Sequence, residues 1–197
     1  MSFLTIFEFY RSFNLMHPVL GAILTGVIIF PIADIISQLI LDKKVDWRKV
    51  KYTLGLSPFY GAYGYVSVLS GLFVGKYISA HSLAMAALGP NLIGNFFNLI
   101  FFVNNSIGQK YGYQLVALPR YYLNLLRRKE QFFAYISGKE YLKAVIGTLT
   151  FWNMVQYINY SYVPLELQTP MVLTVSFAWI IVLSFWSLIA RKKLFKS

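Results

Sequence analysis

The sequence predicts an all-α protein, a multi-pass transmembrane helical bundle of about five spans that forms one integral domain over residues 1–197. Five long stretches of the chain carry no charged residue, and 57% of all residues are hydrophobic while only 13% are charged. A spanning helix needs about 20 apolar residues, and soluble domains are about 25% charged. The stretches also lack the polar–apolar alternation of barrel strands, which leaves helices as the structures that satisfy their own backbone hydrogen bonds in lipid.

The uncharged stretches set the order of the elements. A short amphipathic and aromatic helix over Ser2–Asn14 comes first, and we expect it to lie in the membrane interface. Residues 110–143 form an amphipathic basic loop that is too short and too mixed in composition for a second globular domain. The predicted spans lie at about 17–41, 52–76, 83–107, 144–163 and 169–190, and they are built on the uncharged stretches Ser12–Ala33, Tyr52–Gly75, Tyr77–Gln109, Ala144–Leu165 and Leu167–Ala190.

The net charge of +11 is distributed unevenly between the two sides of this bundle. If all five stretches span the membrane, every basic residue except Arg11 and Lys76 lies in the loops and the tail on one side. This is the positive-inside pattern, so the basic side faces the cytoplasm, or the matrix in a mitochondrion.

The basic loops are also suited to anionic headgroups such as cardiolipin, at about 1 kcal/mol for each base near the surface. The alternative is that they only set the topology. Bases interleaved with aromatic residues can indicate nucleic acid, but beside a membrane they favour a headgroup-level helix, so we expect membrane lipids as partners and no nucleic acid. The candidate lipid-binding bases are Lys43, Lys44, Arg48, Arg120, Arg127, Arg128 and Lys129.

Asp34 is the only acid within a long apolar segment, and Gln38 follows it on the same helix face. An ionisable group there is costly and should face the bundle interior or water. It either lines a pore or lies near the helix end and pairs with a loop base such as Lys44 or Arg48. If it lines a pore, Asp34→Asn should change ion selectivity.

Amide side chains form stripes on the third and fourth spans, at spacings that place them on one helix face. They either hydrogen-bond helix to helix, at roughly 0.6–2 kcal/mol each, or line a polar water path. The stripes contain Asn91, Asn95, Asn98 and Asn105 in the third span, and Asn153, Gln156 and Asn159 in the fourth.

Small residues recur every four positions in the second span, at Ser67, Gly71 and Gly75. Small side chains on one face let another helix approach closely. We expect these residues to pack helices within the chain, with homodimerisation as the alternative.

The motifs that mark common enzymes are missing from the sequence. There are no cysteines, and His17 and His81 have no close acid to complete a metal site. A P-loop, a dinucleotide fingerprint, a GxSxG elbow and paired carboxylates are all absent. We therefore expect no enzyme, no metal site and no cofactor, other than bound phospholipid such as cardiolipin.

Two motifs near opposite ends of the chain resemble the Mpv-seventeen/peroxisomal-membrane-protein-twenty-two family. The first opens with Phe7, Tyr10, His17-Pro18 and Thr25-Gly26 and continues as Ala33-Asp34-Ile35-Ile36-Ser37-Gln38 and Asp46-Trp47-Arg48. The second is similar to the family's WPxxQxxNFxxVP and WxxYLS patterns, and consists of Trp152, Gln156, Asn159-Tyr160, Val163-Pro164, Trp179 and Leu183-Ser184. Departures are Asn153 in place of proline, Gln168 in place of arginine, Gly61-Ala62 in place of Gly-Pro, and no Asp-Gln around Leu88–Asn91.

The resemblance implies a small integral protein of the mitochondrial inner membrane or the peroxisome, similar to non-selective channels for small metabolites and tied to mitochondrial DNA maintenance. We expect a non-enzymatic inner-membrane protein that forms or regulates a small-solute pathway, with its basic loops and C-terminus on the matrix side. The alternative is a structural accessory subunit of a large respiratory-chain complex, with a lipid-binding surface and other membrane subunits as partners. The departures from the family's charged positions favour this alternative.

Overall fold

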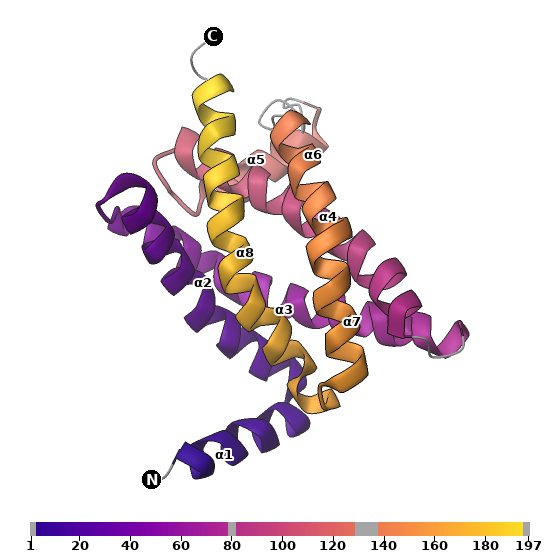
Figure 1. The fold of residues 1–197 in the computed structure, drawn as a ribbon. Coiled ribbons are helices and arrows are strands. Elements are labelled where there is room, and N and C mark those ends of the chain that lie inside the picture. Colours follow the sequence, from indigo (N-terminus) through magenta and orange to yellow (C-terminus); the bar gives the residue numbers. More distant parts are fainter. Residues whose placement is uncertain (1–2, 79–81, 129–137, 195–197) are drawn as a thin grey trace.

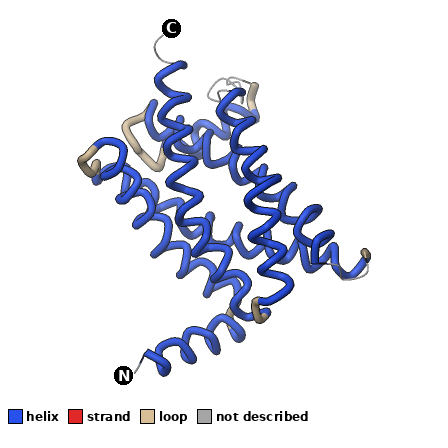
Figure 2. Tube along the Cα trace, viewed as in Figure 1, coloured by secondary structure: helices blue, strands red, loops and turns tan. Residues whose placement is uncertain are grey.

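The computed structural model describes residues 3–78, 82–128 and 138–194, and these ranges contain helices joined by short connections, without a strand (Figures 1 and 2). The predicted all-α membrane bundle is confirmed. The helices are α1 (Phe3–Met16), α2 (Pro18–Asp42), α3 (Trp47–Tyr77), α4 (Ser82–Lys110), α5 (Ala117–Leu126), α6 (Gly138–Gly147), the π-helical segment η2 (Thr148–Trp152), α7 (Asn153–Tyr162) and α8 (Leu165–Leu194).

Three of the described helices are long and apolar enough to cross a membrane by length and composition, at Pro18–Asp42, Ser82–Lys110 and Leu165–Trp186. The other two predicted spans correspond to α3 and to the continuous rod formed by α6, η2 and α7. Tyrosines reduce the hydropathy of α3, and the rod carries its amide stripe together with a π-helical interruption. The span count of about five is therefore an approximate one.

Some helices begin at other residues than predicted, and local capping explains one of these differences. Helix α3 begins five residues before the predicted 52, because the Asp46 side chain accepts a hydrogen bond from the Arg48 N–H at 2.9 Å and caps the first turn. Helix α5 occupies part of the predicted basic loop 110–143, and α6 begins at Gly138. Much of the loop is therefore helical.

Glycine pairs set the closest helix contacts. A Cβ atom added at Gly26 of α2 would lie 2.7 Å from Gly61 Cα in α3, and one added at Gly89 of α4 would lie 2.7 Å from the Gly71 N of α3. These distances leave no room for a side chain, so the backbones touch at both crossings. Helix α3 therefore packs directly against α2 on one side and α4 on the other.

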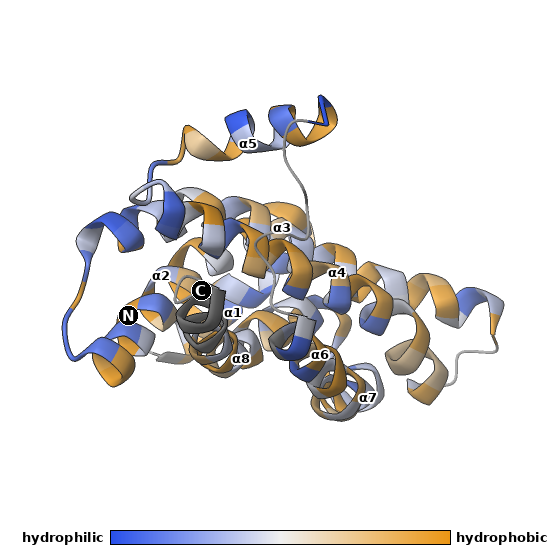
Figure 3. Cartoon of the chain, turned by 90° about the horizontal axis from the view of Figure 1, so that it is seen from above, coloured by the Kyte–Doolittle hydropathy of each residue, from blue (hydrophilic) through white to orange (hydrophobic). Residues whose placement is uncertain are grey.

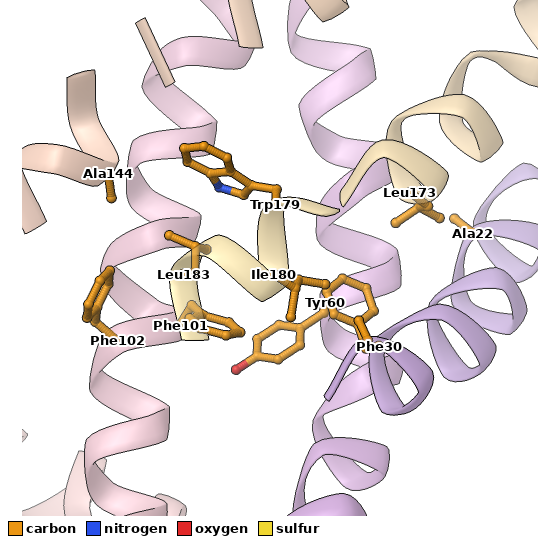
Figure 4. Packing of buried hydrophobic residues seen from close by; sticks show 11 residues of the cluster. Ala22, Phe30, Tyr60, Phe101, Phe102, Ala144, Leu173, Trp179, Ile180 and Leu183 are labelled. Carbon is orange, nitrogen blue, oxygen red and sulfur yellow. The ribbon is translucent and has the colours of Figure 1, made fainter. Parts of the chain in front are cut away.

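The core lies where α8 packs against these helices. It contains buried side chains from α2, α3, α4, α6 and α8, most of them shown in Figure 4: Ala22, Phe30, Tyr60, Phe101, Phe102, Ala144, Leu173, Trp179, Ile180 and Leu183. Large apolar side chains such as Leu92 and Phe96 are also exposed on the outer faces. A bundle that is apolar on both its inside and its outside is suited to lipid.

Hydrophilic residues gather at one end of the bundle. The connection between α2 and α3, helix α5 and the C-terminal end of α8 lie together there, while α1 and the turn between α7 and α8 lie at the opposite end (Figure 1). The hydropathy colouring places much of the hydrophilic surface on α5 and on the connection between α2 and α3 (Figure 3). The basic loops therefore share an end.

Candidate functional site

The first polar group inside the bundle is a charged cluster between α2 and α3, which we name the α2–α3 clamp and define as Asp34, Gln38, Lys49 and Thr53. The Lys49 Nζ lies 2.6 Å from Asp34 Oδ1, and both side chains are largely buried. Asp34 Oδ2 accepts hydrogen bonds from Gln38 Nε2 at 3.1 Å and from Thr53 Oγ1 at 3.2 Å. Gln38 Oε1 in turn accepts from the Asp46 N–H at 2.7 Å. The clamp therefore ties both helices and their connection together.

The partner of Asp34 is a base that the sequence analysis did not select. Lys44 and Arg48 were expected, but Arg48 pairs with Asp46 at 3.1 Å, and its hydrogen bond lowers the pKa of that carboxyl below the usual range. Lys49 lies in the first turn of α3, which begins earlier than predicted. Asp34 lies roughly 12 Å along α2 from its end, within reach of a lysine on the neighbouring helix.

The second polar group is centred on Asn98 of α4. Its Nδ2 donates to Thr148 Oγ1 at 2.8 Å, and its Oδ1 accepts from the Trp179 indole Nε1 at 3.1 Å. Thr148 Oγ1 also donates to the Ala144 carbonyl at 3.0 Å. These bonds join α4, the rod and α8, so this member of the predicted amide stripe connects three helices.

A cavity of about 50 Å³ lies beside Asn98, in the middle of the bundle. Every one of α2, α3, α4, η2, α7 and α8 contributes to its wall. Asn98, Gln156, Ser67 and Ser176 are among the polar groups that line it, and the remaining wall is mostly aromatic, including Phe97, Trp152 and Trp179. The volume is enough for one or two water molecules. Trp152 and Gln156, four residues apart, both reach this cavity.

Several buried amide oxygens near these helices have no hydrogen-bond partner among the described residues. Asn91 donates its Nδ2 to Asn153 Oδ1 at 2.5 Å, and Asn159 donates to Gln156 Oε1 at 3.2 Å. Acceptors are left over on the Oδ1 atoms of Asn91, Asn95 and Asn159 and on Gln168 Oε1. An unpaired buried acceptor is a place where water or a hydroxyl-bearing solute can bind.

The sequence analysis missed Asn104, which is 3% exposed. Its Nδ2 donates to the Tyr60 hydroxyl at 3.1 Å, its Oδ1 accepts from the Tyr122 hydroxyl at 2.8 Å, and its carbonyl accepts from the Tyr52 hydroxyl at 2.6 Å. Burial raises the pKa of Tyr122 to about 12, so its hydroxyl keeps the proton it donates. Asn104 lies on a different helix face from the predicted stripe, whose member Asn105 bonds only to its own helix at Phe101 O.

The small residues of α3 face other helices of the same chain. A Cβ atom at Gly71 would collide with the Tyr160 ring of α7, and one at Gly75 would lie 2.8 Å from Met85 Sδ of α4. Tyr160 donates its hydroxyl to the Val68 carbonyl at 3.0 Å. Ser67 lines the central cavity.

Most of the predicted lipid-binding bases lie on the surface. Lys43, Lys44, Arg120, Arg127 and Arg128 are exposed, whereas the exposed Arg48 is engaged by Asp46. Lys129 lies outside the described residues. No group of three His, Asp or Glu side chains in the described part of the chain could hold a metal ion.

A model of the Mpv17 / PMP22 family matches residues 127–184. The predicted resemblance to this family is confirmed. The matched region contains the rod and most of α8, and therefore Trp152, Gln156, Asn159 and Trp179. The family match and the membrane-length helices together identify a membrane protein. Neither curated protein sequences nor solved structures gave a match to the chain.

Proposed function

We propose that the chain is a non-enzymatic protein of the mitochondrial inner membrane that forms or regulates a pathway for small solutes, with its basic end toward the matrix. The observation that carries this proposal is the central cavity, which lies between the spans and contains Asn98 and Gln156. An interior polar cavity in a membrane bundle is a starting point for a solute path. The family resemblance supports the same function.

The unpaired amide oxygens support this reading further. A buried polar group without a partner costs about 1–3 kcal/mol. Leaving such acceptors on two facing helices is costly if the residues serve packing alone. Water or a solute with hydroxyl donors would satisfy them, so the solutes we propose are small, neutral molecules that can donate hydrogen bonds.

The wall of the central cavity is mostly aromatic and leaves a space of only about 50 Å³. Phe97 packs at 5.3 Å from the rings of both Tyr60 and Tyr63, and all three side chains line the cavity. A pathway through the cavity requires this wall to move or to be smaller. Phe97 is therefore the residue whose size should control passage.

The test is efflux of small fluorescent or radiolabelled solutes from proteoliposomes. Phe97→Ala should raise the efflux rate above that of the wild type, because it enlarges the cavity. The matched control is Phe96→Ala, whose ring is 59% exposed on the outer face and should leave the rate unchanged. Equal efflux for the two variants and for protein-free vesicles would overturn the proposal.

The second candidate is an accessory subunit of a large respiratory-chain complex. The observation that favours it is α1, which projects from the end of the bundle and exposes large apolar side chains, including Leu4, Phe9 and Met16 (Figure 1). The Arg11 guanidinium holds α1 to Glu166 of α8 at 2.6 Å. Gentle detergent extraction and a native gel distinguish the candidates: co-migration with a respiratory complex supports the subunit, and migration alone supports an independent pathway.

A further inference from the structure

A second cavity, of about 130 Å³, lies at the basic end of the bundle, between α5 and the connection that leads into it. We name it the α5 pocket and define it by its lining residues Tyr111, Gln114, Val116, Ala117, Arg120, Tyr121 and Asn124. One face of α5 supplies Arg120 and Asn124, which are four residues apart. The connection supplies Gln114 and the Tyr111 ring. No acid is among the lining residues.

The connection that forms one wall of the pocket is fixed in place. Gly112 and Tyr113 both have positive φ angles, of 64° and 62°. Such a backbone is unfavourable for tyrosine and persists only where contacts hold it. Two contacts do so: the Tyr113 N–H donates to the Gly108 carbonyl at 2.6 Å, and the Tyr113 ring packs against Tyr52 at 5.8 Å. Leu115 is seated on Gly55 of α3, where any side chain would collide with it.

Arg120 differs from the other described bases in the candidate set. Arg48 is paired with Asp46, and Lys43 and Lys44 lie in an exposed connection. Arg127 is exposed at the end of α5 and does not line the α5 pocket. Arg120 alone among these bases has side-chain amides beside it within a cavity. Glutamine and asparagine amides donate hydrogen bonds to phosphate oxygens, and guanidinium is the strongest phosphate partner among side chains.

The outer face of α5 is apolar next to the pocket. Val116 and Leu123 are exposed, and Leu126 is 82% exposed. Apolar side chains in this position are favourable when acyl chains cover them, and bases at the same level then meet the headgroups. A free phosphate ion would leave these side chains in water.

We propose that the α5 pocket binds the phosphate of an anionic phospholipid, with Arg120 as the cation, Gln114 and Asn124 as hydrogen-bond donors, and Val116, Leu123 and Leu126 against the acyl chains. The site would fix one lipid at a defined position, in contrast to a diffuse attraction shared by all the basic loops. It does not depend on whether the central cavity conducts.

The experiment is native mass spectrometry of the full-length protein in detergent, titrated with cardiolipin or with phosphatidylcholine. The wild type should retain cardiolipin in preference to phosphatidylcholine. Arg120→Gln should weaken cardiolipin binding about fivefold, the share expected for one interfacial base. Arg127→Gln, which removes an equal charge from the same helix outside the pocket, should change binding much less. Arg120→Lys should recover part of the loss.

Three results would overturn the proposal. Equal losses of cardiolipin binding in Arg120→Gln and Arg127→Gln would show that the bases attract lipid as a diffuse surface charge. Equal binding of cardiolipin and phosphatidylcholine would show that the protein has no site selective for an anionic lipid. Displacement of cardiolipin by millimolar inorganic phosphate would make the ligand a free anion. Because Arg120 is exposed, its variants should fold as the wild type does, and the melting temperature without added lipid checks this.

Discussion

The α2–α3 clamp and the amides between α4 and α7 are both buried and polar, but they differ in how completely they are paired. In the clamp, both carboxylate oxygens of Asp34 and both ends of the Gln38 amide have partners. Among the interior amides, the Oδ1 atoms of Asn91, Asn95 and Asn159 have no partner in the described part of the chain. A buried charge without a partner is strongly destabilising, whereas an unpaired oxygen on a neutral amide costs only about 1–3 kcal/mol of stability. Complete pairing indicates a structural role, and surplus acceptors indicate a place for something else to bind.

The largest expected effect comes from breaking the clamp on one side. Lys49→Met should reduce the free energy of unfolding by about 3–5 kcal/mol, because it leaves the Asp34 carboxylate buried without a cation. Reversible unfolding in mixed micelles measures the change. The double variant Asp34→Leu/Lys49→Met should recover most of the loss, since replacing both partners of a buried pair is often close to neutral. A double variant as unstable as the single one would contradict a clamp based on charge pairing.

The next effect is at Asn98. Asn98→Leu should reduce stability by about 1–3 kcal/mol, because it leaves the Trp179 N–H without its acceptor and removes the donor to the Thr148 oxygen. Combining it with Trp179→Phe should cost less than the sum of the two single changes, because the shared bond is lost only once. Simple additivity in this double-mutant cycle would show that the bond contributes nothing.

Asn159 should be less sensitive than Asn98. Its described side-chain bond is a single 3.2 Å contact to Gln156, and its Oδ1 has no partner. Asn159→Leu therefore removes an unpaired acceptor together with one weak bond, and the stability should fall by about 1 kcal/mol or less. A loss larger than that of Asn98→Leu, measured in the same micelles, would mean that the Asn159 oxygen is paired after all and would weaken the comparison.

The smallest effect is expected at an exposed ion pair with the same charges as the clamp. Arg11→Gln removes the pair between Arg11 and Glu166, in which the arginine is 45% exposed. Exposed pairs contribute little and are screened by salt. The melting temperature should shift far less than for Lys49→Met, and the shift should shrink as salt is added. A shift that is insensitive to salt would require another explanation for the contact of α1 with α8.

The sequence was sufficient for the fold class and the family resemblance because both depend on local patterns, namely long uncharged stretches and fixed motif spacings. It also located Asp34, Asn98 and Gln156 as polar groups inside the helices, since their burial follows from their positions in apolar segments. It did not identify their partners. Lys49 was missed because its selection depends on where α3 begins, and that start is set by the Asp46 cap.

Asn104 shows a second limit of the sequence. The helical spacing selected Asn105, which continues the amide stripe. Asn104 instead faces α3 and α5 and is hydrogen-bonded to three tyrosine hydroxyls. That arrangement depends on how helices separated in sequence come together. The Gly26–Gly61 contact could not be predicted for the same reason. The spacing of small residues in one helix does not reveal which glycine of another helix lies opposite.

We propose that the clamp holds the bundle together, whereas the amides between α4 and α7 and the polar lining of the central cavity bind solutes. Solute efflux from proteoliposomes tests it most directly, with the wild type, Asp34→Leu/Lys49→Met and Gln156→Leu compared at equal amounts of folded protein. We expect wild-type efflux for the clamp variant and a changed rate for Gln156→Leu, which alters the polar lining of the cavity. Loss of efflux in the clamp variant with an unchanged rate for Gln156→Leu would contradict it.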